Sequence, residues 1–181
     1  MDKVKKARAR MMIGHPFFAT LMASSPWVET RDIPTAATDM KKIYYNPDFF
    51  ETMSVPEIMF VIAHEVMHIA LEHGLRVRSR NPMIWNMACD FAINWTLREC
   101  STQSGRYEMT VPEGALIDNK YADMSADKIY DDLMQQADEA RKNGQSGDPG
   151  DEGGTSASGM PQPDPNLQGD LQQPMSGNNP A

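Results

Sequence analysis

Residues 61–70 have the sequence VIAHEVMHIA, which contains the pattern H-E-x-x-H within an otherwise uncharged and apolar run. Residues four positions apart share one face of a helix, so the spacing predicts that His64 and His68 bind one metal ion together. Glu65 is then placed to take a proton from a water at that metal. A helix that is apolar all round is buried, and ionisable groups inside it need a partner. We therefore predict a zinc ion there rather than a chance match to the pattern.

Two histidines are too few for a stable zinc site, because a catalytic zinc usually has three protein ligands and one position for water. The next predicted helix carries Asn86, Asp90 and Asn94 at the spacing i, i+4 and i+8, on one face. This polar stripe would face solvent on an ordinary amphipathic helix. The other faces carry large aromatic residues and few charges, which favours a stripe that points inward. An ionised Asp90 pointing inward needs a cation as partner.

Both helices have clear starts in the sequence. Ser54 and Glu57 form a capping box ahead of the motif, with a proline in the first turn. Gly74 predicts the end of that helix. The second helix is expected to begin after Asn81 as N-cap and to run to about Arg98.

The rest of the chain predicts a small α+β domain over residues 1–140. A first helix with a basic face is expected over residues 1–23, and a last helix from Ser125 to about Ala140. Residues 33–45 favour a β-hairpin with a turn at Asp39-Met40 and one strand exposed at the edge of a short sheet.

From Arg141 the composition changes to Gly, Pro, Ser, Gln, Asn and Asp, with almost no large apolar residue. Such a segment cannot offset the entropy of ordering itself, so we predict a disordered acidic and polar tail over residues 141–181. This tail is the candidate contact for a protein partner.

Charge and hydropathy exclude several classes of protein. The net charge is −8 and no basic patch is present, so nucleic acid is not an expected partner. No apolar run is long enough to cross a bilayer, so no membrane is expected either.

Cys89 and Cys100 would lie roughly 16 Å apart along one helix, whereas a disulfide needs Cα atoms within about 7 Å. Free thiols predict a cytoplasmic location.

The chain resembles the bacterial metallopeptidase domain of the DUF2201 type, a small zincin family similar to the minigluzincins. The residues that carry the resemblance span nearly all of the predicted domain; they are Pro34–Asp39, Tyr44–Pro47, His64–His68, Trp85–Asn94 and Ser125–Tyr130.

This resemblance implies a fold, a site and an activity. The fold is a zincin with an active-site helix, a supporting helix and a short sheet with an exposed edge. Asp90 becomes the third zinc ligand, and Asn94 supports a metal histidine. The activity is zinc-dependent hydrolysis of peptide bonds in a polypeptide substrate, with Glu65 as general base. The chain departs from the gluzincin pattern in having Asp rather than Glu as ligand, Asn at the supporting position, and Met40 where the family favours Gly.

Two alternatives stay open at this point. His73 is a rival third ligand, but it lies about 140° round the helix from His68 and can join the site only if the helix breaks. It is otherwise expected as a partly exposed residue of the last turn. The rival function is a zinc-stabilised binding or assembly module with a vestigial peptidase site. Its motivation is that nothing selects among Tyr107, Tyr121 and Arg76 as the group that stabilises an oxyanion.

Overall fold

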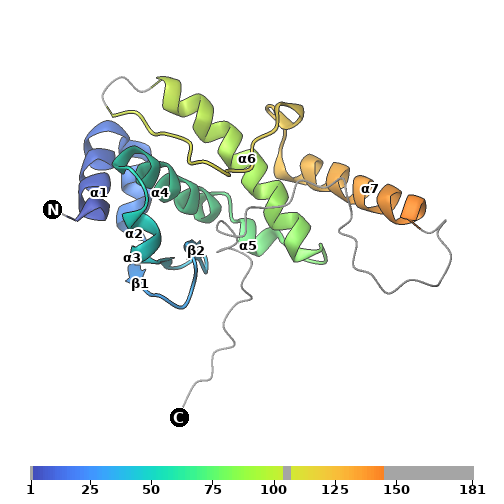
Figure 1. Ribbon diagram of the computed structural model, residues 1–181, viewed down its shortest axis with the longest axis horizontal. Helices are drawn as coiled ribbons and strands as arrows, with labels where there is room; N and C mark the ends of the chain where they lie inside the picture. Colours follow the sequence, from blue (N-terminus) through green and yellow to red (C-terminus); the bar gives the residue numbers. More distant parts are fainter. Residues whose placement is uncertain (1, 104–106, 145–181) are drawn as a thin grey trace, which may run out of the picture.

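Helix α4 (Val55–Ala70), which carries the H-E-x-x-H pattern, lies between helices α1 and α6 (Figure 1). The predicted capping box is present: the Ser54 hydroxyl accepts from the backbone N–H of Glu57, and the Glu57 carboxylate accepts from that of Ser54. Helices α1, α2 and α6 and strand β2 pack around α4. Most of its residues are buried, as its apolar run predicts.

The computed structural model describes residues 2–103 and 107–144. Around α4 it places a small sheet and a set of helices, which confirms the predicted α+β fold. The helices are α1 (Lys3–Gly14), α2 (Pro16–Ser24), α3 (Pro47–Glu51), α5 (His73–Arg76), α6 (Pro82–Gln103), the short 3-10 helix η1 (Asn119–Tyr121) and α7 (Ala126–Gly144).

The sheet has three short strands in the order β1-β3-β2: β1 (Trp27–Glu29), β3 (Ile43–Tyr45) and β2 (Ala36–Thr38). The antiparallel pair β2 and β3 confirms the predicted hairpin, with Ala37 opposite Tyr44. Strand β1, which pairs parallel to β3, was not predicted. Strand β2 is an edge of this sheet and packs on α4, so the exposed edge lies next to the motif helix.

The first predicted helix is in fact two helices. Chain direction changes at His15, and Pro16 begins α2 at its first position. Proline has no backbone N–H and its ring clashes with the preceding turn, so it ends one helix but can start the next. The His15 ring lies 2.6 Å from the Tyr107 carbonyl oxygen and ties this break to the segment after α6.

The end of α4 differs from the prediction as well. The helix ends at Ala70, not at Gly74, because Glu72 adopts the left-handed conformation with a φ of 53°. The chain then turns into α5. The expected C-terminal role of Gly74 is therefore wrong, and a non-glycine residue makes the turn instead.

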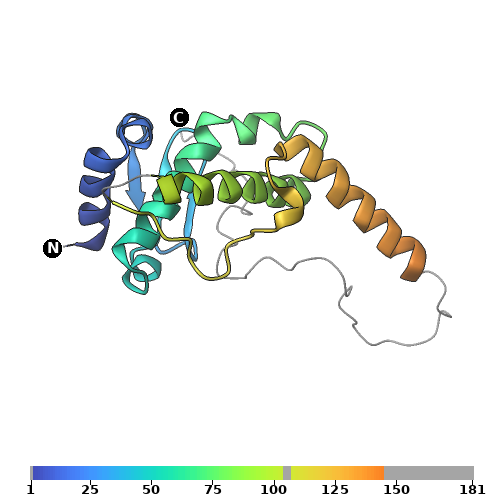
Figure 2. The ribbon, with the colours of Figure 1, turned by 90° about the horizontal axis from the view of Figure 1, so that it is seen from above.

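Helix α6 begins as predicted: the Asn81 side chain accepts hydrogen bonds from the backbone N–H groups of Met83 and Ile84. Helix α7 packs on α6 and then projects away from the rest of the described structure (Figure 2). It runs to Gly144, four residues past the predicted end. The rest of the predicted tail, residues 145–181, lies outside the described residues.

A large core lies between α1, α2, α4 and the sheet, and a smaller one joins α6 to α7. Among the described residues no helix is long and apolar enough to cross a membrane. Cys89 and Cys100 are both free thiols, as predicted.

Candidate metal centre

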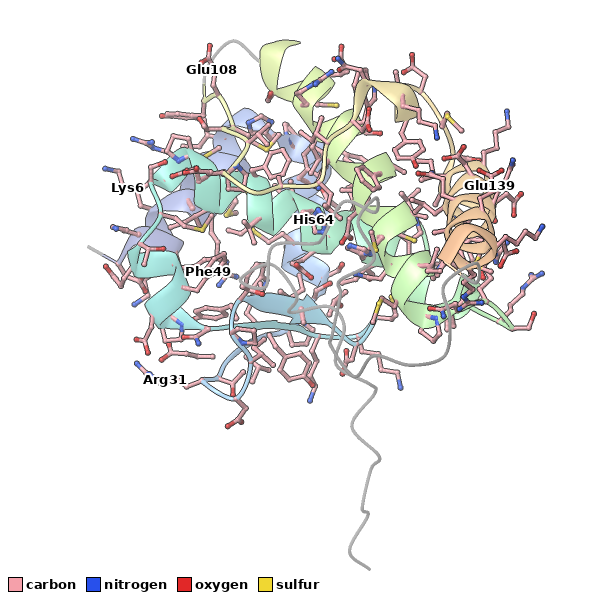
Figure 3. The ribbon with its side chains drawn as sticks, turned by 45° about the vertical axis from the view of Figure 1, so that its right-hand side comes forward. Lys6, Arg31, Phe49, His64, Glu108 and Glu139 are labelled. Carbon is pink, nitrogen blue, oxygen red and sulfur yellow. The ribbon has the colours of Figure 1, made fainter. Side chains whose placement is uncertain are left out.

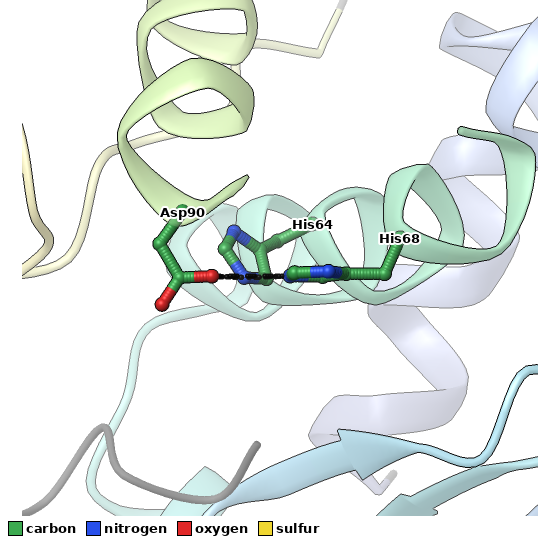
Figure 4. Close-up of side chains that lie close together, drawn as sticks. All are labelled: His64, His68 and Asp90. Carbon is green, nitrogen blue, oxygen red and sulfur yellow. Dashed lines mark hydrogen bonds and ion pairs between the residues drawn. The ribbon is translucent and has the colours of Figure 1, made fainter. Parts of the chain in front are cut away.

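The side chains of His64, His68 and Asp90 converge at the contact between α4 and α6 (Figure 4). The Nε2 atoms of the two histidines are 2.9 Å apart. Oδ1 of Asp90 lies 3.5 Å from Nε2 of His64 and 3.2 Å from Nε2 of His68. Figure 3 shows that His64 lies in the interior, between the sheet and α6. The structure thus brings together the three residues that the sequence singled out.

The ring of His64 is oriented by Asn94. Nδ2 of Asn94 donates to the Leu116 carbonyl oxygen over 3.1 Å, and a carbonyl oxygen can only accept, so this atom is the amide nitrogen. The amide oxygen of Asn94 then faces Nδ1 of His64 at 2.8 Å. His64 must donate there, which leaves the Nε2 lone pair pointing toward Asp90 and His68.

Asp90 is oriented by Asn86, one turn earlier on α6. Nδ2 of Asn86 donates to Oδ2 of Asp90 over 3.2 Å, which turns Oδ1 toward the histidines. Burial by itself would raise the pKa of the Asp90 carboxyl, but the neighbouring rings of His64 and His68 lower that pKa below its ordinary value. Asp90 is therefore an anion, and the whole predicted stripe faces inward.

His73 is buried, with 3% of its surface exposed, so the expected partly exposed last-turn residue is wrong. The left-handed Glu72 swings the chain so that Nδ1 of His73 lies 3.3 Å from Nδ1 of His68. It thus approaches the Nδ1 edge of the His68 ring and does not join the three converging ligand atoms. Burial lowers the pKa of His73 to about 3, and the neighbouring His68 and Arg76 lower it too, so His73 is neutral.

Glu65 follows His64 on α4, and only 3% of its surface is exposed. An ionised carboxylate at such a position is costly unless cations or hydrogen-bond donors lie near it. The H-E-x-x-H pattern thus places an acid in the interior beside the first histidine, where the sequence predicts a general base.

The three converging atoms suit a metal ion. Nδ1 of His64 donates to Asn94, so its Nε2 lone pair lies beside the Asp90 carboxylate and Nε2 of His68, and a cation bound between the three atoms would be held by all of them. A tetrahedral ion with bonds of about 2.0–2.1 Å holds its ligand atoms about 3.3 Å apart, close to the observed 2.9, 3.2 and 3.5 Å. Two imidazoles and one carboxylate are a donor set that zinc accepts.

The three residues considered for oxyanion stabilisation have other contacts. Arg76 is paired with Asp127. The hydroxyl of Tyr121 donates to Asp132. The ring of Tyr107 lies against Gly14, at the break between α1 and α2. The structure does not bring any of them to the metal centre through the contacts that it records.

Sequence reasoning missed the contact of His73 with His68 and the part that Leu116 plays. A left-handed turn at a glutamate has no signal in the sequence, and Leu116 contributes only its backbone. The role of Asn86 was indicated by its place in the stripe, four residues before Asp90.

A family model and a curated protein are similar to this chain. A protein of Thermotoga maritima called "Uncharacterized protein" is 26% identical over 126 residues, which are 65% of this chain and 32% of that protein. The chain thus spans about a third of that relative. No solved structure is significantly similar to the chain. The model of the family DUF2201, described as "Putative metallopeptidase domain", matches residues 1–175. The match includes both helices of the metal centre, and the chain belongs to this family of metallopeptidase domains.

Proposed function

We propose that the protein is a zinc-dependent peptidase of the zincin type, which hydrolyses internal peptide bonds of polypeptides. The observation that carries the proposal is the convergence of His64, His68 and Asp90 next to the buried Glu65. These residues supply the three ligands and the acid–base group that a catalytic zinc site requires.

Each side chain has a distinct part in the proposed reaction. His64, His68 and Asp90 would hold the ion. A bound zinc ion supplies Lewis acidity for the scissile carbonyl and lowers the pKa of a water to about 7. Glu65 takes a proton from the attacking water and later passes it to the leaving amine. Burial strengthens these proton transfers, because fewer waters compete for the carboxylate.

Strand β2 is the proposed docking edge for the substrate. It is an edge of the sheet, its other side is paired with β3, and it packs on α4. An extended polypeptide can add to such an edge through backbone hydrogen bonds, which demand no particular side chains. We therefore expect flexible or unfolded segments as substrates. The free thiols of Cys89 and Cys100 fit a cytoplasmic location, which we also propose.

The test is a peptidase assay on an unstructured protein, together with a zinc measurement on the purified chain. We expect about one zinc per chain, loss of cleavage on treatment with a chelator, and recovery when zinc is added back. Zinc-loaded protein that cleaves no flexible polypeptide would contradict the peptidase proposal.

A second candidate is a zinc-stabilised binding or assembly module. The observation that favours it is the engagement of Arg76, Tyr121 and Tyr107 in other contacts, which leaves the oxyanion group unassigned. The same assay separates the two candidates. A binding module would hold zinc and lose thermal stability on chelation, yet would cleave nothing.

A further inference from the structure

We infer that His73 is a positioning residue for the metal centre: it accepts a hydrogen bond from Nδ1 of His68 and so fixes the ring and the tautomer of that ligand. The inference rests on the proposed zinc site.

The geometry at His68 leaves one arrangement of hydrogens compatible with metal binding. Nε2 of His68 faces Nε2 of His64 and Oδ1 of Asp90, and it must carry a lone pair to bind a cation there. The hydrogen of a neutral His68 ring then lies on Nδ1. This atom is 3.3 Å from Nδ1 of His73, in the interior of the protein. A neutral His73 with its own hydrogen on Nε2 can accept at Nδ1.

His73 reaches this position only because the chain leaves the helix before it. In a continuous helix it would lie about 140° round from His68. Glu72, with a φ of 53°, turns the chain at the end of α4, and α5 begins at His73. The strained turn thus brings a buried histidine to the Nδ1 edge of a ligand ring.

Helix α6 also contacts His73, through Trp85. Nε1 of Trp85 donates to the His73 carbonyl oxygen over 2.9 Å. The two rings pack edge to face, with centroids 6.0 Å apart. The guanidinium of Arg80 lies over the same indole at 4.4 Å and pairs with Asp127 of α7. These contacts hold the backbone of His73 in place and pack its ring against Trp85, beside the His68 ring.

Each of the three ligands then has its own support. Asn94 accepts from His64, Asn86 donates to Asp90, and His73 accepts from His68. Partners of metal ligands fix ring orientation and tautomer, and their loss typically weakens metal affinity by about 10–100-fold.

The test compares His73→Phe with His73→Asn. The phenylalanine keeps an aromatic ring against Trp85 but cannot accept a hydrogen bond. The oxygen of the asparagine amide can lie close to the place of Nδ1. His15→Phe is the matched control, because it makes the same change at a buried histidine whose recorded partner is the Tyr107 carbonyl oxygen and not a proposed metal ligand.

Zinc affinity is measured by competition with a chromophoric chelator. We expect His73→Phe to weaken zinc binding by about 10–100-fold, His73→Asn to restore part of this loss, and His15→Phe to leave the affinity unchanged. In the zinc-loaded wild type, nitrogen NMR of the imidazoles should show a hydrogen on Nδ1 of His68 and none on Nδ1 of His73.

A wild-type chain that binds no zinc overturns the proposed function, and this inference with it. Wild-type zinc affinity in His73→Phe, or a hydrogen on Nδ1 of His73, overturns the inference alone. If His73→Phe does not fold, two other measurements decide. The inference is supported if Nδ1 of His73 carries no hydrogen in the wild type and if His73→Asn loses less than tenfold in zinc affinity.

Discussion

The amide oxygen of Asn94 lies 2.8 Å from Nδ1 of His64, and this contact joins α6 to α4 at the metal centre. The Asn94 amide is itself fixed, because its nitrogen donates to the Leu116 carbonyl oxygen. A segment that follows α6 in the chain therefore determines which nitrogen of His64 carries the hydrogen. The centre depends in this way on the packing of three segments and not on the H-E-x-x-H motif alone.

Glu65→Gln should separate metal binding from catalysis. The amide cannot take a proton from water, so we expect cleavage to fall by about 10²–10⁴-fold, the usual contribution of a general base. Zinc content should stay at the wild-type level, since Glu65 is not among the converging ligands. Activity at the wild-type level in Glu65→Gln would exclude its role as general base.

Asp90 and its supporting residues should differ in their effect on zinc affinity. Asp90→Ala removes a proposed ligand and should abolish stable binding, whereas Asn86→Ala and Asn94→Ala should each weaken binding by about 10–100-fold. Thr96→Ala, on the same helix but hydrogen-bonded only to its own turn in the described contacts, is the control. Chelator competition measures all four variants. An Asp90→Ala chain that binds zinc more tightly than Asn94→Ala would show that Asp90 is not a ligand.

Because Glu72 adopts the left-handed conformation, we expect glycine to be tolerated at this position and a β-branched residue to destabilise the protein. Glycine adopts a φ of 53° without steric cost, so Glu72→Gly should keep the free energy of unfolding within about 1 kcal/mol of wild type. A β-branched residue is strained there, and Glu72→Val should lose about 1–3 kcal/mol. Denaturant unfolding of both metal-free variants checks this. Equal stabilities would mean that the chain can leave the helix in another way.

Gly74 and Met40 should be coupled. A Cβ at Gly74 would lie 2.7 Å from Cγ of Met40, so Gly74→Ala forces the Met40 side chain, or the turn that carries it, to shift. We expect a loss of about 1 kcal/mol or more for Gly74→Ala, as for other overpacked sites. In a Met40→Ala background the clash is gone, and the same change should cost less or stabilise the helix. A double-mutant cycle of unfolding free energies measures the difference, and additive effects would contradict the contact.

Removal of residues 145–181 should leave the domain folded. These residues offer almost no large apolar side chain for a core, so the thermal midpoint of a chain ending at Gly144 should stay within a few degrees of the full chain. A fall of more than about 10 °C, the shift for roughly 2 kcal/mol in a domain of this size, would show that the tail packs on the domain.

The parts of this protein that depend on local spacing could be predicted from the sequence. Four-residue intervals placed His64 and His68 on one helix face and Asp90 and Asn94 on another, because residues at that interval share a face whatever surrounds them, while the family resemblance implied the roles of Asp90 and Asn94. The capping box at Ser54 and the turn at Asp39 likewise depend on neighbours in the chain, and both appear in the structure.

How these elements meet depends on packing between segments that are distant in the chain. The left-handed Glu72 and the inward position of His73 have no local signal, because they arise where the start of α5 packs against Trp85 of α6. Strand β1 is another such case, since three residues form a strand only when β3 offers its backbone beside them. Side-chain periodicity is a property of one element, whereas a ligand's supporting contacts come from elements distant in the chain, and only packing brings these together.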